Sequence, residues 1–306
     1  MSVSAGAKVQ RRTSGLSDKV RKRIEITILS LPALIMFLGF VILPVFMAGY
    51  YGFFKWKGYG KPTVNGQFIG FENYKVILTD PNFQQALGHT LFVVVASLVI
   101  QGPLAILFAL LLNQKFKGRA LIRTLIFVPY VVSEVIVGTG WSLILQTTGA
   151  LNALLKKIGL GGADWISDPK IAIWTLMFII SWKYIGFAVI LMIAGMQSIP
   201  EDLYEAAKVD GAGFWRQQWS ITLPLLGPTI RIWAFMSIIG SLQLFDLVYI
   251  IWGQYVSSTA GTSTMATYMV REGRLANNYG YGSAVAVVIF IISLVIALTY
   301  QRFVLN

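Results

Sequence analysis

The chain has 306 residues, of which 56% are hydrophobic and only 12% are charged, a composition that excludes an ordinary soluble domain. The net charge of +12 suggests nucleic acid at first sight. However, the basic residues are scattered or flank apolar stretches, so anionic lipid headgroups explain them better. The sequence contains no cysteine, which excludes disulfides and thiolate metal sites.

The N-terminal part of the chain is polar and basic and precedes a long apolar run. That run is too long for the hydrophobic core of a signal peptide, and no small-residue cleavage site follows it. We therefore predict a cytoplasmic basic segment over residues 1–27 and a membrane domain over residues 28–306. The lysines and arginines of the basic segment indicate that the N-terminus lies inside.

Apolar runs of about 20 residues recur along the chain, the length that a hydrocarbon core of about 30 Å requires of a helix. We predict six membrane spans, over residues 28–52, 86–112, 121–146, 171–196, 225–252 and 282–299. Pro32 and Pro44 are expected to bend the first span, and residues 151–158 to form a short interfacial helix. The fold class is therefore an all-α integral membrane protein, with both termini on the same, cytoplasmic side.

The sequence lacks the residue combinations of common catalytic sites. His89 is the single histidine, so a metal cluster of several histidines cannot form, and we expect His89 to be a satisfied polar residue. The phosphate-binding signature G-x-x-x-x-G-K-[ST] is absent as well. We predict that the chain is not an enzyme and binds no metal or cofactor of its own.

The longest polar passage between apolar runs separates the fourth and fifth predicted spans. Ser198 and Glu201 have the spacing of a helix capping box, and Pro200 suits the first turn of the helix that they would begin. Gly211 would end this helix, since glycine adopts the left-handed conformation that a C-terminal cap often requires. A second short helix would follow and end near Pro224. The pattern predicts a bent helix pair at a membrane surface.

Within this passage, residues 198–224, the order is Glu-Ala-Ala, three residues, Gly, nine residues, Ile, one residue and Leu-Pro. This spacing resembles the EAA loop of the membrane subunits of binding-protein-dependent ABC importers at every fixed position. In that family the loop is the coupling helix, which docks into a groove of the ATPase subunit. The resemblance implies an ATPase-coupling role for Glu205, Ala206, Ala207, Asp210, Gly211, Ala212, Ile221, Leu223 and Pro224.

Motifs around the loop resemble the carbohydrate-uptake permeases of the maltose and glycerol-phosphate type. They include residues 195–200, 245–249 and 279–284. One departure is that the family often carries a Gly-Gly-Pro turn where residues 253–255 are Gly-Gln-Tyr. The resemblance covers roughly residues 30–303 and implies a transmembrane domain like that of type I ABC importers.

By this resemblance the chain is the permease subunit of an ATP-driven importer of a sugar or oligosaccharide in a prokaryotic inner membrane. The implied partners are a second permease subunit in a heterodimer, two ATPase subunits that carry ATP and Mg²⁺, and an extracytoplasmic solute-binding protein. Closure of the ATPases on ATP would be transmitted through the coupling loop to spans three to six. No nucleic acid partner is implied.

Charged residues inside membrane spans are costly and mark candidates for function. Glu134, Lys183 and Asp246 are such residues, and their polar and aromatic neighbours suit a sugar. The predicted substrate path consists of Ser133, Glu134, Trp141, Trp182, Lys183, Tyr184, Gln243, Phe245 and Asp246. Alternatively, the three charged residues pair with each other or with a second subunit and fix helix packing. Trp252 and Tyr50, near span ends, are interpreted as interfacial belt residues.

Other functional classes stay open from the sequence. An amino-acid or peptide ABC permease is the nearest alternative. A secondary transporter would need no ATPase and would show internal repeats around a midplane site, and no convincing repeat is present. A structural or receptor-like membrane subunit would give the Glu-Ala-Ala to Leu-Pro spacing no purpose.

Overall fold

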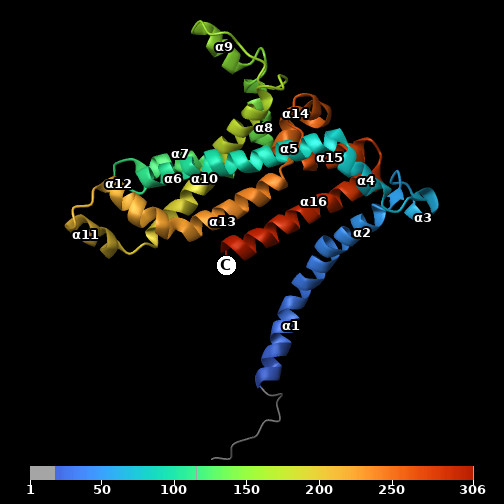
Figure 1. Ribbon diagram of the computed structural model, residues 1–306, viewed down its shortest axis with the longest axis horizontal. Coiled ribbons are helices and arrows are strands. Elements are labelled where there is room, and N and C mark those ends of the chain that lie inside the picture. Colours follow the sequence, from blue (N-terminus) through green and yellow to red (C-terminus); the bar gives the residue numbers. More distant parts are fainter. Residues whose placement is uncertain (1–17, 115, 306) are drawn as a thin grey trace, which may run out of the picture. The chain divides into compact units, whose positions relative to one another are not determined.

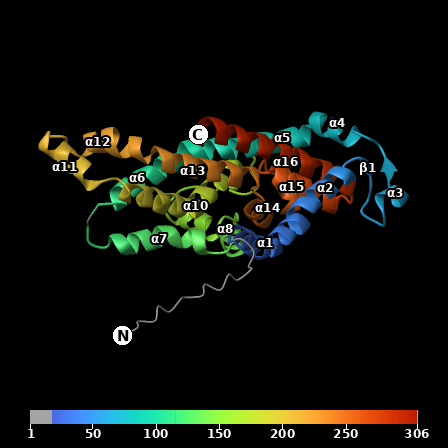
Figure 2. The same cartoon turned by 90° about the horizontal axis from the view of Figure 1, so that it is seen from below.

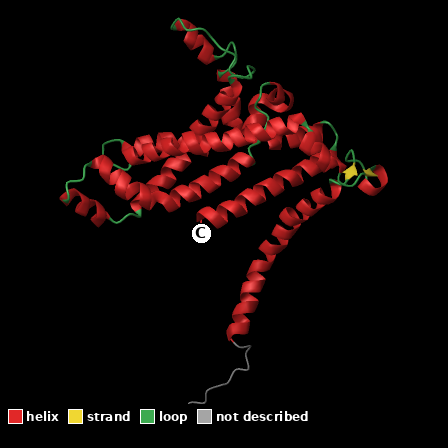
Figure 3. Ribbon diagram, viewed as in Figure 1, coloured by secondary structure: helices red, strands yellow, loops and turns green. Residues whose placement is uncertain are grey.

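The structure, a computed structural model, describes residues 18–114 and 116–305, and most of them lie in helices (Figure 3). The prediction of an all-α membrane protein is confirmed. Within the described ranges, β-structure is one short antiparallel ribbon of β1 (Phe54–Lys55) and β2 (Gln67–Phe68). The chain divides into two compact units, residues 1–48 and 49–306. Much of the predicted basic segment, residues 1–17, lies outside the described residues.

The first unit is built on one long helical run. Helix α1 (Asp18–Phe37) continues through the π-helix η1 (Leu38–Ile42) into α2 (Leu43–Tyr51), and together they form a candidate span over Lys19–Tyr51. Pro44 is the second residue after the π-helix. Because proline has no N–H, the carbonyl one turn earlier loses its usual partner, and a wider turn is one way in which a helix accommodates this.

The second unit is a bundle of long helices that lie side by side (Figures 1 and 2). The first is α5 (Pro81–Ala96), which continues through the π-helix η2 (Ser97–Gln101) into α6 (Gly102–Leu112). The others are α10 (Ala172–Gln197), α13 (Leu223–Leu242) and α16 (Tyr279–Tyr300), and α16 continues into the π-helix η5 (Gln301–Leu305). With α7 (Arg119–Val131) and α8 (Glu134–Ile144) counted as one broken span, the described chain has six candidate spans, as predicted.

Helix α10 occupies the centre of the bundle, because it packs against α6, α7 and α13. Of its 18 most apolar consecutive residues, 56% are buried, the largest share among the five unbroken candidate spans. Gly186 allows the closest of these contacts. A Cβ atom at this position would lie 2.2 Å from the carbonyl oxygen of Ile126 in α7, so a glycine is required where the two backbones touch.

The predicted span over residues 121–146 is not straight, because α7 and α8 meet at 96°. Val132 and Ser133 between them are extended, and the Ser133 hydroxyl caps α8 by accepting the N–H of Ile136 at 3.4 Å. Pro129, in the last turn of α7, has no N–H to continue the helical pattern. The hydropathy of the stretch is continuous, so the break was not visible in the apolar pattern.

The predicted span over residues 225–252 is shifted toward the N-terminus. A continuous helical run begins with α12 (Phe214–Gln217), passes through η3 (Gln218–Thr222) and ends with α13 at Leu242. The prediction that a helix ends near Pro224 is therefore wrong. The π-helix η3 directly precedes α13, and Pro224 is the second residue of α13; a wider turn is one way in which a continuous helical run accommodates a residue without an N–H. Residues 243–245 are not helical and separate α13 from α14 (Asp246–Thr259).

The predicted loops carry helices of their own. Residues 53–85 contain α3 (Pro62–Asn65) and α4 (Glu72–Thr79), and residues 253–281 contain α15 (Met265–Val270) and η4 (Arg271–Leu275). The short helix expected over residues 151–158 is present as α9 (Ala150–Lys157). Helices α3 and α4 lie at one end of the bundle, and α11 (Glu201–Val209) lies at the opposite end (Figures 1 and 2).

Trp252 is a core residue and not an interfacial belt residue, so that prediction is wrong. Its side chain is 2% exposed, and its indole N–H donates to the Ile166 carbonyl at 2.7 Å. This bond joins α14 to the segment before α10, where apolar residues of α5, α8, α10 and α14 form one of the cores. Tyr50, by contrast, is exposed.

Candidate functional site

The passage that resembles an EAA loop contains the first of the two helices that its sequence predicts, α11, whereas the second is the start of the long helical run from α12 to α13. Helix α11 ends at Val209, and Gly211 follows with φ at 78°, in the left-handed region. The N–H of Ala212 then returns to the Ala207 carbonyl at 2.8 Å, which satisfies one of the open carbonyls at the helix end. The predicted role of Gly211 in ending this helix is confirmed.

The beginning of α11 differs from the expected capping box. Pro200 is the N-cap residue and not part of the first turn, and no side chain caps α11 there. The Ser198 hydroxyl instead donates to the Gly195 carbonyl at 2.7 Å, within the last turn of α10. Glu201 and Asp202 still place negative charge in the first turn of α11, where the helix dipole favours it.

Helix α11 offers an exposed surface at its end of the bundle (Figure 1), and none of its residues is buried. Glu205, Ala206 and Asp210 of the predicted coupling set are exposed, and so are Gly211 and Pro224. The other members, Ala207, Ala212, Ile221 and Leu223, are partly buried. An uncovered apolar side chain, Val209 at 87% exposure, lies on the same helix.

Hydrogen bonds connect α11 to the base of α13. The Tyr204 hydroxyl lies 2.9 Å from the hydroxyl of Thr222, and Thr222 donates to the Gln218 amide oxygen at 2.8 Å. The Gln217 amide donates to the Ala212 carbonyl at 2.7 Å, between the two helices of the pair. Sequence reasoning missed these residues. The available signal was a run of polar side chains, Gln217, Gln218 and Thr222, at the start of an apolar helix.

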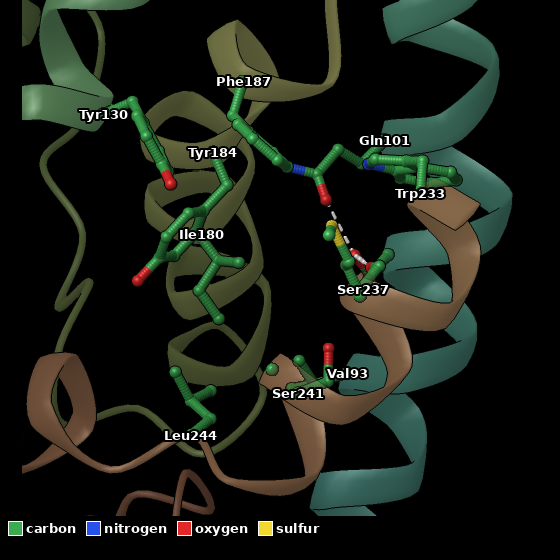
Figure 4. Close-up of a pocket in the computed structure, with 13 residues that line it drawn as sticks. Val93, Gln101, Tyr130, Ile180, Tyr184, Phe187, Trp233, Ser237, Ser241 and Leu244 are labelled. Carbon is green, nitrogen blue, oxygen red and sulfur yellow. Dashed lines mark hydrogen bonds between the residues drawn. The ribbon is translucent and has the colours of Figure 1, made fainter. Parts of the chain in front are cut away.

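A cavity of about 390 Å³ lies inside the bundle, between η2, α7, α10 and α13 (Figure 4). One wall carries a polar network in which Ser97 donates to the Gln101 amide oxygen at 2.7 Å and lies 2.7 Å from the Ser237 hydroxyl. The Nε2 atom of Gln101 is buried and has no hydrogen-bond partner within the described chain. Because an unsatisfied buried N–H is costly, this donor is suited to a bound polar molecule.

The opposite wall of the cavity is aromatic. Tyr130 of α7 stacks on Phe187 of α10, with ring centroids 5.1 Å apart, and its ring lies 6.2 Å from that of Tyr184. Figure 4 shows Tyr130 and Tyr184 on the side facing Gln101 and Trp233. The cavity therefore offers aromatic faces on one side and hydrogen-bonding groups on the other.

The structure brings one residue of the predicted substrate path, Tyr184, into the wall of this cavity. Glu134 accepts the hydroxyl of Tyr184 from behind the wall, and Lys183 is 2% exposed and donates to the Val132 carbonyl at 2.8 Å. Ser133 caps α8. The remaining members lie on other surfaces: Trp141 and Trp182 meet edge to face at 5.4 Å, Phe245 stacks on Tyr249 at 5.0 Å, and Gln243 and Asp246 are exposed.

Sequence reasoning missed most of the cavity wall, including Ser97, Gln101, Tyr130, Trp233 and Ser237. The sequence signal was weak: a serine and a glutamine one helical turn apart inside an apolar run. His89 is a satisfied polar residue as expected, with its Nδ1 atom 3.1 Å from the Ser263 carbonyl oxygen. Among the described residues, no cluster of histidine, aspartate and glutamate side chains suits a metal ion.

Known proteins with similar sequences are permeases. Residues 101–305 match the family described as "Binding-protein-dependent transport system inner membrane component". The chain is 30% identical over 276 residues to the trehalose/maltose transport system permease protein MalF of Thermococcus litoralis, which covers 89% of this chain and 90% of that protein. It is 32% identical over 234 residues to the arabinooligosaccharides transport system permease protein AraP of Bacillus subtilis, covering 76% and 74%.

Solved structures agree with the sequence relatives. A chain of a bacterial alginate ABC transporter, solved in complex with an alginate pentasaccharide-bound periplasmic protein, matches with a TM-score of 0.81 and 27% identity, covering 93% of this chain and 95% of that one. The expected type I importer-like transmembrane fold is confirmed by this match. With the family match and the permease relatives over most of its length, the chain belongs to the family of inner-membrane components of binding-protein-dependent transport systems.

Proposed function

We propose that this chain is the permease subunit of an ATP-driven importer whose cargo is a neutral sugar or oligosaccharide. The observation that carries the proposal is the cavity inside the bundle. Its volume of about 390 Å³ falls within the usual range of small-molecule sites, about 300–1,000 Å³. None of its lining residues is an aspartate, glutamate, lysine or arginine. An amino acid carries two charges that such a wall would leave unpaired, whereas a neutral sugar carries none.

The two walls suit the two kinds of surface on a sugar. Aromatic rings such as Tyr130 and Phe187 can pack on the apolar C–H face, and the polar rim can bond to Ser237 and to the free N–H of Gln101. The names of relatives support a carbohydrate cargo, since MalF of Thermococcus litoralis is described for trehalose and maltose and AraP of Bacillus subtilis for arabinooligosaccharides.

Coupling to ATP requires a second polypeptide in this proposal. The exposed α11 docks on an ATPase subunit, which binds ATP and Mg²⁺, and this chain binds neither. Movement of α11 then passes through Tyr204 and Thr222 to α13, which also carries Trp233 and Ser237 of the cavity wall. A two-state bundle biased by nucleotide in this way would expose the cavity to each side of the membrane in turn.

The assembly that this function needs contains further subunits. It comprises a second permease subunit in a heterodimer, two ATPase subunits and an extracytoplasmic solute-binding protein. In this arrangement both termini and residues 198–224 face the cytoplasm of a prokaryotic cell. The placement of α11 and of α3 and α4 at opposite ends of the bundle is compatible with that topology (Figure 1).

Uptake into proteoliposomes tests the proposal. The complete complex is reconstituted with its binding protein, ATP is enclosed, and radiolabelled neutral mono- and oligosaccharides are compared with amino acids and dipeptides. The proposal expects ATP-dependent uptake of at least one neutral sugar and none of the zwitterions. If only an amino acid or a peptide is taken up, the proposed sugar cargo is wrong and the chain is a permease for that compound. Uptake driven by an ion gradient without ATP would point to a secondary transporter.

A further inference from the structure

Lys183 makes an unusual set of contacts for a charged residue in a membrane helix. It lies in α10 with 2% exposure, and its Nζ atom is 2.8 Å from the Val132 carbonyl oxygen and 3.5 Å from that of Pro129. In an uninterrupted helix these two carbonyls would accept N–H groups one turn later. The 96° break between α7 and α8 removes those partners, and the ammonium group takes their place.

The contact made by Lys183 bears directly on the cavity wall. Tyr130 lies between Pro129 and Val132 in the last turn of α7, and its ring forms part of the aromatic wall. Its orientation depends on how this turn is held against α10, since its ring stacks on Phe187. Lys183 therefore fixes a cavity residue without lining the cavity itself.

On the other side of the break, Glu134 contacts a second tyrosine of the cavity wall. It is the first residue of α8, and its carboxylate accepts the hydroxyl of Tyr184, the residue after Lys183. The Tyr184 proton is then engaged behind the wall, so the phenolic oxygen remains available to accept a hydrogen bond. Gln101, across the cavity, offers a free donor. The two walls thus present an acceptor and a donor in fixed positions.

We propose that Lys183 and Glu134 are positioning residues for the cargo cavity, which hold the broken span so that Tyr130 and Tyr184 keep one arrangement. Neither residue contacts the cargo. Lys183 acts through the Pro129 and Val132 carbonyls at the end of α7, and Glu134 acts through the hydroxyl of Tyr184. This inference rests on the proposed function, because it assigns the two tyrosines to cargo recognition.

A double-mutant cycle tests whether Glu134 acts through Tyr184. Uptake of the sugar identified with the wild-type complex is measured per assembled complex for E134L, Y184F and the double variant, with E134Q as the matched control. E134Q keeps an oxygen that accepts the phenol, whereas E134L does not. We expect E134L and Y184F each to lower uptake about tenfold, the double variant to fall no further, and E134Q to stay within about threefold of wild type. Multiplied losses in the double variant would overturn the role of Glu134.

Spin-label distances test Lys183 independently of any cargo. The chain has no cysteine, so labels on T124C in α7 and L143C in α8 report the geometry of the break directly. We expect K183M to broaden the distance distribution and to lower uptake about tenfold, while K183R and K183Q, which keep N–H donors, retain the narrow distribution. A narrow distribution with unchanged uptake in K183M would overturn the proposal.

Failure of the proposed function gives a different pattern from failure of this inference. If no neutral sugar is taken up by the wild-type complex, the proposed cargo is wrong, and the label distances still decide whether Lys183 holds the break. If K183M fails to insert into the membrane, the label distances of K183Q and the double-mutant cycle on Glu134 and Tyr184 still test the proposal. Uptake at the wild-type rate by E134L, at normal levels of the complex, would contradict the positioning role of Glu134 directly.

Discussion

At the end of the bundle that carries α3 and α4, the carboxylate of Asp80 accepts hydrogen bonds from three other residues. It caps α5 by accepting the N–H of Asn82 at 2.8 Å, and it also accepts the hydroxyls of Tyr268 at 2.5 Å and Tyr281 at 3.2 Å. Burial alone would raise the pKa of the Asp80 carboxyl, but these hydrogen bonds to the charged form outweigh it, and its pKa lies below the usual value. One residue therefore joins α5, α15 and α16.

The Asp80 contacts predict an acid-dependent loss of stability. Because the folded-state pKa is depressed, the stabilisation is complete above the unfolded-state pKa of about 4 and is lost as the pH falls through the folded-state value. We expect D80N to lower the free energy of unfolding by about 1–3 kcal/mol at pH 7, and the difference from wild type to shrink as the pH falls below about 4. Thermal unfolding in detergent at several pH values measures it. A difference independent of pH would contradict the assigned role.

Gly211 offers a second prediction at the scale of single residues. Its φ of 78° strains any residue with a side chain, although a Cβ there would meet nothing within 4 Å. We expect G211D to abolish uptake while membrane insertion remains normal, because the strain and the new charge disturb the surface of α11. G213A is the matched control, since Gly213 has an ordinary φ of −68° and equal space. Normal uptake by G211D at normal complex levels would count against the coupling role.

At the scale of elements, α11 and α13 are joined by few atoms. The bond between Tyr204 and Thr222 is the main side-chain link from the exposed helix to the helix that lines the cavity. We expect Y204F to lower the ATPase rate stimulated by loaded binding protein about threefold, with complex assembly unchanged. T222V should have the same effect, and the double variant should add little to either. Independent, multiplied effects would mean that the two residues do not act as one link.

The helices themselves were largely predictable, but their interruptions were not. Apolar runs of sufficient length identify spans wherever they occur, and the local turn chemistry of Gly211 fixes the end of α11. The break after Val131 depends on Lys183, about fifty residues further along the chain, whose ammonium group satisfies the open carbonyls. A hydropathy profile contains no information on such a partner, and for the same reason Trp252 was assigned to the membrane interface.

At the scale of the whole molecule, the two parts of the candidate site differ in how far sequence reveals them. The coupling loop is contiguous in the chain, so its motif can be seen in one stretch. The cavity is assembled from η2, α7, α10 and α13, and its polar members are single residues in apolar runs. Charged residues attract attention in a membrane span, yet here Lys183 and Glu134 stand behind the wall while uncharged Gln101 and Ser237 form it.

The cavity yields a prediction for transport by the complete complex. Q101L removes the free donor and keeps a similar volume, so we expect sugar uptake to fall about tenfold while the ATPase rate without binding protein stays within about twofold of wild type. V95L, at an exposed position of the same helical run, is the control and should leave both unchanged. Equal uptake by Q101L and wild type would exclude this cavity from the cargo path.

The most direct test of the importer assignment is purification of the protein from native membranes in mild detergent, with identification of its partners and assay of ATP hydrolysis. We predict recovery of a second six-span permease subunit and a P-loop ATPase, with a rate that rises when a solute-binding protein and a neutral sugar are added. Recovery of the protein alone, without ATPase activity and with uptake driven by an ion gradient, would contradict the account.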